Sequence, residues 1–171
     1  MVIRALALAA GVTGAAGLSQ FPEFSQQYTQ RLGGAVDELT RVVAQFDRDA
    51  ATLGLSRDAA LSQLATGGDF GAARAQSMRD TVTRQTRLSA DLQALEGAGP
   101  FMRARLAGHL SDPEIATRAW SAYRPALPLT FEGAIFGGVG FGAGWLALSA
   151  LWALLARLFR RKARTERFAG P

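Results

Sequence analysis

The chain has 171 residues, a formal net charge of +5 and no cysteine. The absence of cysteine excludes structural disulfides, cysteine-ligated zinc and thiol nucleophiles. The excess positive charge lies at the two ends, because residues 19–130 contain twelve arginines and twelve acidic residues. A neutral middle offers no basic face to a phosphate backbone, so we expect no nucleic-acid partner.

The N-terminal segment is uncharged from Ala5 to Pro22 and is preceded by Arg4. As a helix, about 18 residues span roughly 27 Å, which is a thin fit to the hydrocarbon core of a bilayer. One interpretation is a secretory signal peptide, with Ala15 and Gly17 as the small residues of a cleavage site.

The second interpretation, which we favour, is an uncleaved signal anchor over residues 1–21. Small residues, among them Ala7, Gly11 and Gly14, recur in it at the spacing that lets two membrane helices approach closely. The segment is therefore predicted to remain as a first transmembrane helix.

The next predicted helix covers residues 22–51 and has one apolar stripe with a polar face opposite. The pair Gly33-Gly34 lies inside it, and each glycine costs about 1 kcal/mol of helix stability. We therefore expect a bend or a close contact at this pair. The apolar stripe consists of Phe24, Tyr28, Leu32, Val36, Leu39, Val43, Phe46 and Ala50.

A short helix and then a second long helix are predicted to follow. Ser56 is a natural N-cap for the short helix, which ends near Thr66, and Asp69 is predicted to cap the long one. The long helix extends to Leu95, where Gly97-Ala-Gly-Pro stops it. Two amphipathic helices of similar length joined by a compact turn predict an antiparallel hairpin. Its second stripe is expected to consist of Phe70, Met78, Val82, Leu88, Leu92 and Leu95.

Two shorter helices are predicted after Pro100. The first covers residues 101–110, and the second opens at Ser111-Asp112-Pro113-Glu114, where proline takes the first helical position and residues 114–123 follow. Trp120 and Tyr123 end this second helix, a few residues before the next apolar segment. They are predicted either to lie at the outer membrane interface or to pack against the hairpin.

The most apolar segment has no charged residue from Gly133 to Ala156. About 24 residues of helix span roughly 36 Å, more than the hydrocarbon core, so residues 128–159 are predicted to form a transmembrane helix. Glu132 and Trp152 are expected at its outer and inner interfaces. The glycines from Gly138 onward imitate a nucleotide-binding motif, but that motif requires a preceding strand.

Glycines also form a stripe along this second span. In lipid, close backbone approach through such a stripe is a main source of helix association. We expect the stripe to pack against the N-terminal helix, or to dock a helix of another membrane protein or of a second copy. The stripe consists of Gly133, Gly137, Gly140 and Gly144, with Gly138 and Gly142 beside it.

A cluster of basic residues follows the second span. Together with Arg4 it predicts that both termini are cytoplasmic and that residues 22–127 lie on the other side of the membrane, in the periplasm of a bacterium. Residues 160–171 then form a basic cytoplasmic tail. The predicted fold is an all-α membrane protein, with two transmembrane helices flanking an extracytoplasmic antiparallel hairpin and short extra helices. The basic cluster consists of Arg157, Arg160, Arg161, Lys162, Arg164 and Arg167.

Catalysis is not expected. His109 is the only histidine, and its spacing from the carboxylates is not that of a metal site. The acidic residues are interleaved with arginines, which indicates a solvated ion-pair face. No serine lies in a nucleophile motif. We therefore predict no catalytic residue, no metal and no cofactor.

The stretch Gly17-Leu-Ser-Gln-Phe-Pro-Glu-Phe, followed by Gln30-Arg-Leu-Gly-Gly, resembles a block in a proteobacterial family of small membrane proteins, the domain of unknown function 2937. The resemblance extends over nearly the whole chain, since members have an apolar N-terminal segment, this block, and a C-terminal span with a basic tail. It implies a bacterial inner-membrane location and supplies no activity.

We therefore expect a non-enzymatic accessory or scaffolding subunit of a larger membrane complex, which binds partners through the hairpin and the glycine-rich transmembrane faces. Besides the lipid bilayer, the expected partner is another membrane protein or a second copy. The alternative is a membrane-anchored periplasmic ligand-binding or sensing module. That function needs an apolar cavity with convergent polar groups between the hairpin helices.

Overall fold

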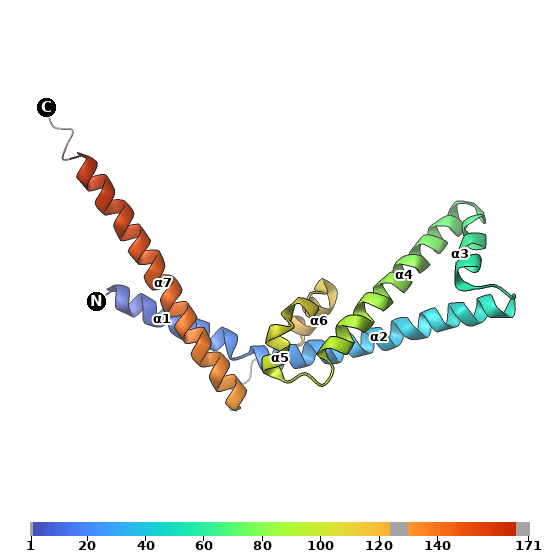
Figure 1. Cartoon of the computed structure of the whole chain (residues 1–171), viewed down its shortest axis with the longest axis horizontal. Coiled ribbons are helices and arrows are strands. Elements are labelled where there is room, and N and C mark those ends of the chain that lie inside the picture. Colours follow the sequence, from blue (N-terminus) through green and yellow to red (C-terminus); the bar gives the residue numbers. More distant parts are fainter. Residues whose placement is uncertain (1, 124–129, 167–171) are drawn as a thin grey trace. The chain divides into compact units, whose positions relative to one another are not determined.

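The structure is a computed structural model that describes residues 2–123 and 130–166. All regular structure in these residues is helical, as predicted, and no strand occurs among them (Figure 1). The helices form two compact units: unit 1 combines residues 1–23 with residues 124–171, and unit 2 comprises Phe24–Tyr123. The predicted boundary between residues 127 and 128 lies outside the described residues.

Unit 1 consists mainly of two helices that pack against each other, α1 (Val2–Leu18) and α7 (Phe131–Glu166). The Thr130 hydroxyl begins α7 as an N-cap, because it accepts a hydrogen bond of 3.1 Å from the Gly133 N–H. The first residues of α2 (Phe21–Thr52) also belong to this unit. There the Phe21 ring lies 5.2 Å from the ring of Phe136.

Among the described residues, one helix is long and apolar enough to cross a membrane. It is the part of α7 from Phe131 to Arg157, which has 27 residues and a mean hydropathy of 1.7. The predicted second span therefore has a helix of the expected kind. The helix α1 is shorter, with 17 residues, so its role as a transmembrane helix stays a prediction.

Unit 2 is a hairpin of two long helices with shorter helical elements attached. Figure 1 shows α2 and α4 as antiparallel arms joined at one end through α3, while α5 and α6 lie beside the first half of α2. The elements after α2 are α3 (Arg57–Ala65), α4 (Gly68–Leu95), α5 (Pro100–Arg105), the 3-10 helix η1 (Ala107–His109) and α6 (Pro113–Ser121).

The core of unit 2 lies where α2, α4 and α6 meet. The apolar positions of α2 recur every three or four residues and therefore face one side, as predicted from the sequence. Ile115 and Ala119, one turn apart on α6, close this core. The core cluster consists of Tyr28, Leu32, Val36, Leu88, Leu95, Ile115 and Ala119.

At the α3 end of unit 2, an ion pair joins α3 to α2 and a close backbone approach joins α3 to α4. The Arg57 guanidinium donates two hydrogen bonds to the Asp47 carboxylate, at 2.7 and 2.5 Å. A Cβ atom on Gly71 would collide with the carbonyl oxygen of Leu64, so only glycine allows α3 and α4 to lie this close. Ala75 is buried one turn further along α4.

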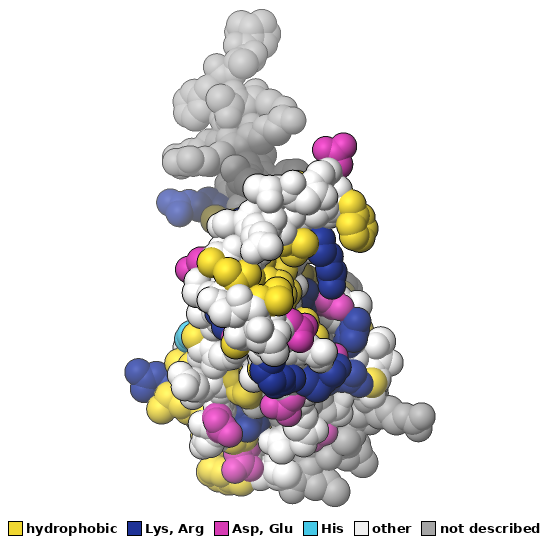
Figure 2. All heavy atoms as spheres, turned by 90° about the vertical axis from the view of Figure 1, so that its right-hand side faces the viewer, with side chains coloured by type: hydrophobic (Ala, Val, Ile, Leu, Met, Phe, Trp, Pro, Cys, Tyr) yellow, Lys and Arg dark blue, Asp and Glu magenta, His cyan; other side chains and the backbone are white. Residues whose placement is uncertain are grey.

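Two predictions at the start of α4 are wrong. The N-cap is Gly67 and not Asp69, because the helix begins earlier, at Gly68, whose φ of +76° favours glycine. Phe70 is 84% exposed and not part of the buried stripe, since α3 packs on the face of Gly71 and Ala75. Figure 2, which looks onto this end, shows hydrophobic side chains among charged side chains of both signs.

Other boundaries differ from the predictions by a few residues. The helix expected over residues 101–110 is split into α5 and η1, and α6 ends at Ser121. The pair Gly33-Gly34 lies within the continuous helix α2. A Cβ atom at either glycine meets no atom within 4 Å in the described part of the chain, so no close contact exists there.

Candidate functional site

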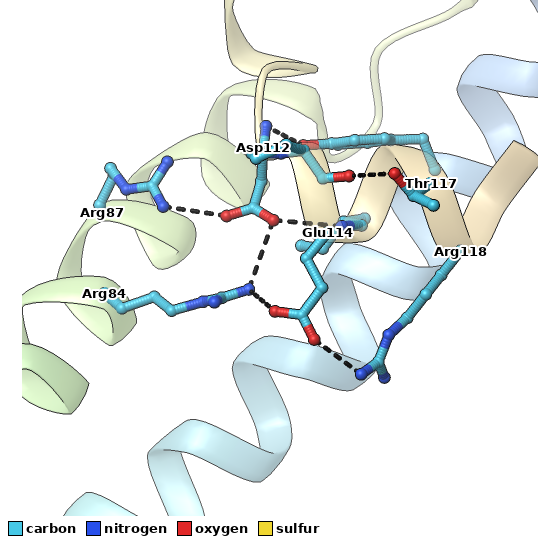
Figure 3. Close-up of polar contacts among 9 residues, drawn as sticks. Arg84, Arg87, Asp112, Glu114, Thr117 and Arg118 are labelled. Carbon is cyan, nitrogen blue, oxygen red and sulfur yellow. Dashed lines mark hydrogen bonds and ion pairs between the residues drawn. The ribbon is translucent and has the colours of Figure 1, made fainter. Parts of the chain in front are cut away.

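Asp112 connects the three helices of the core. As the N-cap of α6, its carboxylate accepts a hydrogen bond of 3.1 Å from the Ile115 N–H. It also accepts hydrogen bonds from two arginines of α4, Arg84 at 3.3 Å and Arg87 at 2.9 Å (Figure 3). The Asp112 N–H donates to the hydroxyl of Tyr28 on α2, at 3.0 Å. One residue therefore fixes α6 against both arms of the hairpin.

The electrostatics of this cluster keep Asp112 ionised. Its side chain is 3% exposed. Burial alone would raise the pKa of the carboxyl, but the Ile115 hydrogen bond and the two arginines outweigh burial, so the pKa lies below its ordinary value. Burial raises the pKa of the Tyr28 hydroxyl, which therefore stays neutral and accepts the Asp112 N–H.

A chain of ion pairs extends from this cluster to the protein surface. Arg84 bridges Asp112 and Glu114, with its guanidinium 2.8 Å from the Glu114 carboxylate. Glu114 in turn accepts a hydrogen bond of 2.6 Å from Arg118, one turn further along α6. Figure 3 shows these side chains as one connected row.

This row forms one wall of an open groove between α2, α4 and α6. Its volume is about 710 Å³. Apolar side chains of Ala35, Leu39 and Ile115 lie in it beside three arginines and three acidic residues, so the groove has no net charge. The groove is lined by Arg31, Gly34, Ala35, Glu38, Leu39, Asp80, Thr81, Arg84, Glu114, Ile115 and Arg118.

The two glycines of α2 differ in their relation to the groove. Gly34 lines it, whereas Gly33 is not among the lining residues. Neither position has an atom of the described chain within 4 Å of an added Cβ. The open space at Gly34 therefore belongs to the groove itself.

The structure brings several of the helix-packing glycines of unit 1 together. A Cβ atom on Gly14 would collide with the carbonyl oxygen of Gly140, and one on Gly144 would collide with that of Ala10. At Gly11 it would lie 2.8 Å from the ring of Phe141. The stripes of α1 and α7 thus pack on each other, which is one of the two arrangements that the sequence left open.

Three other glycines of α7, namely Gly137, Gly138 and Gly142, are not part of this tight contact. Gly137 lies in ordinary contact with the Ser19 side chain, since its Cβ would be 3.5 Å away. Gly138 and Gly142 have no described atom within 4 Å of an added Cβ. Gly133 is buried in the first turn of α7.

The residues expected at membrane interfaces differ in their surroundings. Trp120 is 70% exposed, and its ring stacks on that of Tyr123 at 5.9 Å. Glu132 is half-buried in the first turn of α7, and Trp152 is exposed further along the same helix.

The basic residues from which the membrane topology is predicted lie on α1 and α7 or beyond the described residues. Arg4 and Arg157 are exposed on α1 and α7. The next four lie on the last turns of α7, and their side chains are outside the described part, as is the whole of Arg167; these four are Arg160, Arg161, Lys162 and Arg164.

His109 has an ordinary partner in the structure. Its Nδ1 lies 2.8 Å from a carboxylate oxygen of Asp91, so it connects η1 to α4. Among the described residues, no group of three histidine, aspartate or glutamate side chains is placed to hold a metal ion.

The sequence indicates only part of this site. Asp112-Pro113 indicates a helix start, and Gly33-Gly34 indicates a position in α2 where helix stability is given up. The partners of Asp112 are 84, 28 and 25 residues away, and no local pattern connects them. The groove was therefore not predictable from spacing.

The described residues form an all-helical protein of two units. One unit contains a pair of helices packed through glycines, and the other contains a helical hairpin with an open groove lined by charged residues. The chain belongs to the family described as "Protein of unknown function (DUF2937)", whose match covers residues 2–161. This assignment confirms the resemblance seen in the sequence. No curated protein and no solved structure matches the chain.

Proposed function

We propose that this chain is a non-enzymatic interaction protein of the bacterial inner membrane. Unit 1 is the anchor, with α1 and α7 in the bilayer and both termini in the cytoplasm. Unit 2 lies in the periplasm and holds a helical segment of another membrane-complex subunit in the groove. The apolar length of α7 and its flanking arginines support the anchor, and the groove supports the binding function.

The observation that carries the binding function is Gly34. A glycine inside a helix costs about 1 kcal/mol relative to alanine, so it usually has a packing reason. The described part of the chain supplies none, since nothing approaches the position within 4 Å. A partner backbone in the groove would supply one, as Gly140 does for Gly14 in unit 1.

One face of α2 lines the groove along its length. The lining residues of α2 lie at positions 31, 34, 35, 38 and 39, which is the spacing of one helix face. From position 31 to position 39 this face extends about 12 Å, or roughly two turns. Small residues, Gly34 and Ala35, lie in the middle of this face, and the long charged side chains of Arg31 and Glu38 lie on either side of them. We therefore expect an amphipathic helix whose apolar stripe is flanked by charges of both signs.

A second candidate function is the binding of a small ligand. The groove volume of about 710 Å³ lies in the range of small-molecule sites, and arginines and carboxylates converge on its apolar part. A molecule carrying both positive and negative groups would suit it. A periplasmic sensing module would have this property.

The two functions are separated by purifying the full chain from its native membrane in mild detergent, with chemical crosslinking and mass spectrometry. The test variant is Gly34→Leu, whose side chain fills the groove, and the matched control is Gly33→Leu. We expect one larger subunit to co-purify in stoichiometric amount with the unaltered chain and with the control. The Gly34→Leu chain should lose it.

A monomer that carries a small molecule, lost in Gly34→Leu but not in Gly33→Leu, would establish the second function. Equal binding by both leucine variants would overturn the groove as the binding site. Circular dichroism of both variants verifies that α2 remains helical, which is expected because leucine favours helix over glycine.

A further inference from the structure

One end of unit 2 carries an aromatic cluster whose residues are not among those that line the groove. Phe24, Trp120 and Tyr123 form it: the Trp120 and Tyr123 rings stack at 5.9 Å, and the Phe24 ring meets them edge-on at 6.1 and 6.4 Å. Despite these contacts, Trp120 remains 70% exposed. A large aromatic side chain held in place by its neighbours and open to the outside is a typical contact residue.

The helix α5 adds apolar and basic side chains at the same end of α2. Its Phe101 and Met102 are both exposed. Arg103 ties the helix to the first half of α2, because its guanidinium donates a hydrogen bond of 3.0 Å to the Gln26 side chain. Arg105 ends the same short helix and is exposed. We call Phe101, Met102, Arg105, Trp120 and Tyr123 the proximal surface.

The chain itself shows what this surface is close to. Phe24 is the first residue of unit 2 and Tyr123 is the last, so both connections to unit 1 leave from the aromatic cluster. The apolar stretch of α7 begins at Phe131, only eight residues after Tyr123. If α7 enters a membrane, only a short length of chain separates the aromatic cluster from the membrane surface.

We infer that the proximal surface lies in the headgroup region of the bilayer. Tryptophan and tyrosine are enriched at this depth, since their rings are apolar and their N–H and O–H groups reach water. The exposed Phe101 and Met102 would be solvated by the upper acyl chains, and the Arg105 guanidinium would meet lipid phosphates. This inference rests on the proposed membrane anchor and not on the groove.

The other exposed apolar side chains of unit 2 provide a control. Leu53 and Phe70 lie at the α3 end, at the far ends of helices of 32 and 28 residues. A helix of about 30 residues is roughly 45 Å long. If only the end with the chain connections meets lipid, Phe70 stays in water.

The test uses tryptophan fluorescence of the full chain in lipid nanodiscs. The chain has three tryptophans, Trp120, Trp145 and Trp152, so chains with a single tryptophan are made by replacing the others with phenylalanine. A fourth chain carries Phe70→Trp in a background without the natural three. Quenchers are lipids brominated near the headgroup, lipids brominated deep in the acyl chain, and aqueous acrylamide.

We expect Trp120 to be quenched by the lipids brominated near the headgroup and to be shielded from acrylamide. Trp145 should be quenched by the deep bromines, and the tryptophan at position 70 by acrylamide alone. If Trp120 behaves like position 70 while Trp145 still responds to the deep bromines, the inference is overturned and the anchor stands. If Trp145 and Trp152 also fail to respond to brominated lipid, the anchor is overturned and this inference with it.

Discussion

Asp112 connects the three helices that form the core of unit 2. It caps α6 and receives hydrogen bonds from two arginines of α4, while its N–H binds Tyr28 of α2. Because α2, α4 and α6 all bond to this one residue, and its side chain carries the bonds to α4 and the cap of α6, loss of the side chain should destabilise the whole unit. The groove lies beside the same cluster, so its shape depends on Asp112 as well.

Asp112→Ala should lower the free energy of unfolding by about 2–3 kcal/mol, since it removes an N-cap and the acceptor for two arginines. Asp112→Asn should cost less, because asparagine is an equally good N-cap and loses only the charge. The measurement is thermal unfolding of the full chain in detergent, followed by circular dichroism. Equal midpoints for the alanine variant and the unaltered chain would contradict this role.

The same residue predicts a pH dependence. The pKa of Asp112 is lowered in the folded chain, so its stabilisation is present above the unfolded-state value of about 4 and is lost as pH falls through the folded value. The difference in unfolding midpoint between the unaltered chain and Asp112→Asn should be constant from pH 7 to about 5 and shrink below about 4. A difference that persists unchanged to the acid end would show that charge is not the cause.

For single residues, the sequence predicts helix caps but not hydrogen-bond partners that lie far away along the chain. Ser56 was predicted as an N-cap, and its hydroxyl accepts from the Ala59 N–H at 3.2 Å. Asp112 was predicted to lie in a helix start and does cap α6. Its bonds to Tyr28 and Arg87 depend on how the helices are arranged, which local sequence does not encode.

At the scale of elements, the contact between α1 and α7 is made by backbone and not by large side chains. Gly14, Gly140 and Gly144 allow it, and a Cβ at any of them would meet backbone of the other helix. Such contacts suit lipid, where the hydrophobic effect does not drive helices together.

This packing can be tested by a disulfide, because the chain has no cysteine of its own. The Cβ of a residue at position 137 would lie 3.5 Å from the Cβ of Ser19, a distance that a disulfide allows. The double variant Ser19→Cys, Gly137→Cys should therefore form an intramolecular disulfide on mild oxidation in membranes, detected as loss of alkylatable thiols at unchanged monomer mass.

Adding Gly14→Leu should reduce the yield of this disulfide strongly, because leucine would collide with the Gly140 backbone. Adding Gly138→Leu is the matched control and should leave the yield unchanged, since its Cβ meets open space. Disulfide-linked dimers in place of the intramolecular bond would mean that the stripes pack between chains.

Elements with strong periodicity or caps were predicted well, and elements that depend on neighbours were not. The stripe of α2 was found from its spacing, and Leu95 was correctly placed as the end of α4. Phe70 fits the same periodic pattern, yet the close approach of α3 at Gly71 turns it outward. Periodicity identifies a helix face, but the packing partner decides which part of that face is buried.

For the whole molecule, the division into two units follows the composition. Apolar, glycine-rich ends form unit 1 and the charge-balanced middle forms unit 2. The groove is a property of three elements together: α2 lines it with one face, α4 with Asp80 to Arg84, and α6 with Glu114 to Arg118. No single segment of sequence carries that arrangement, which is why a binding site was expected only in general terms.

The most direct test of the account is photo-crosslinking from inside the groove in the native membrane. A benzophenone amino acid is placed at Thr81, which lines the groove, and as a matched control at Thr83, which is exposed on α4 and is not a lining residue. We predict one adduct of defined higher mass from position 81, absent from position 83 and abolished by Gly34→Leu but not by Gly33→Leu. Identical adducts from both positions, or an adduct at 81 that survives Gly34→Leu, would contradict a partner helix in the groove.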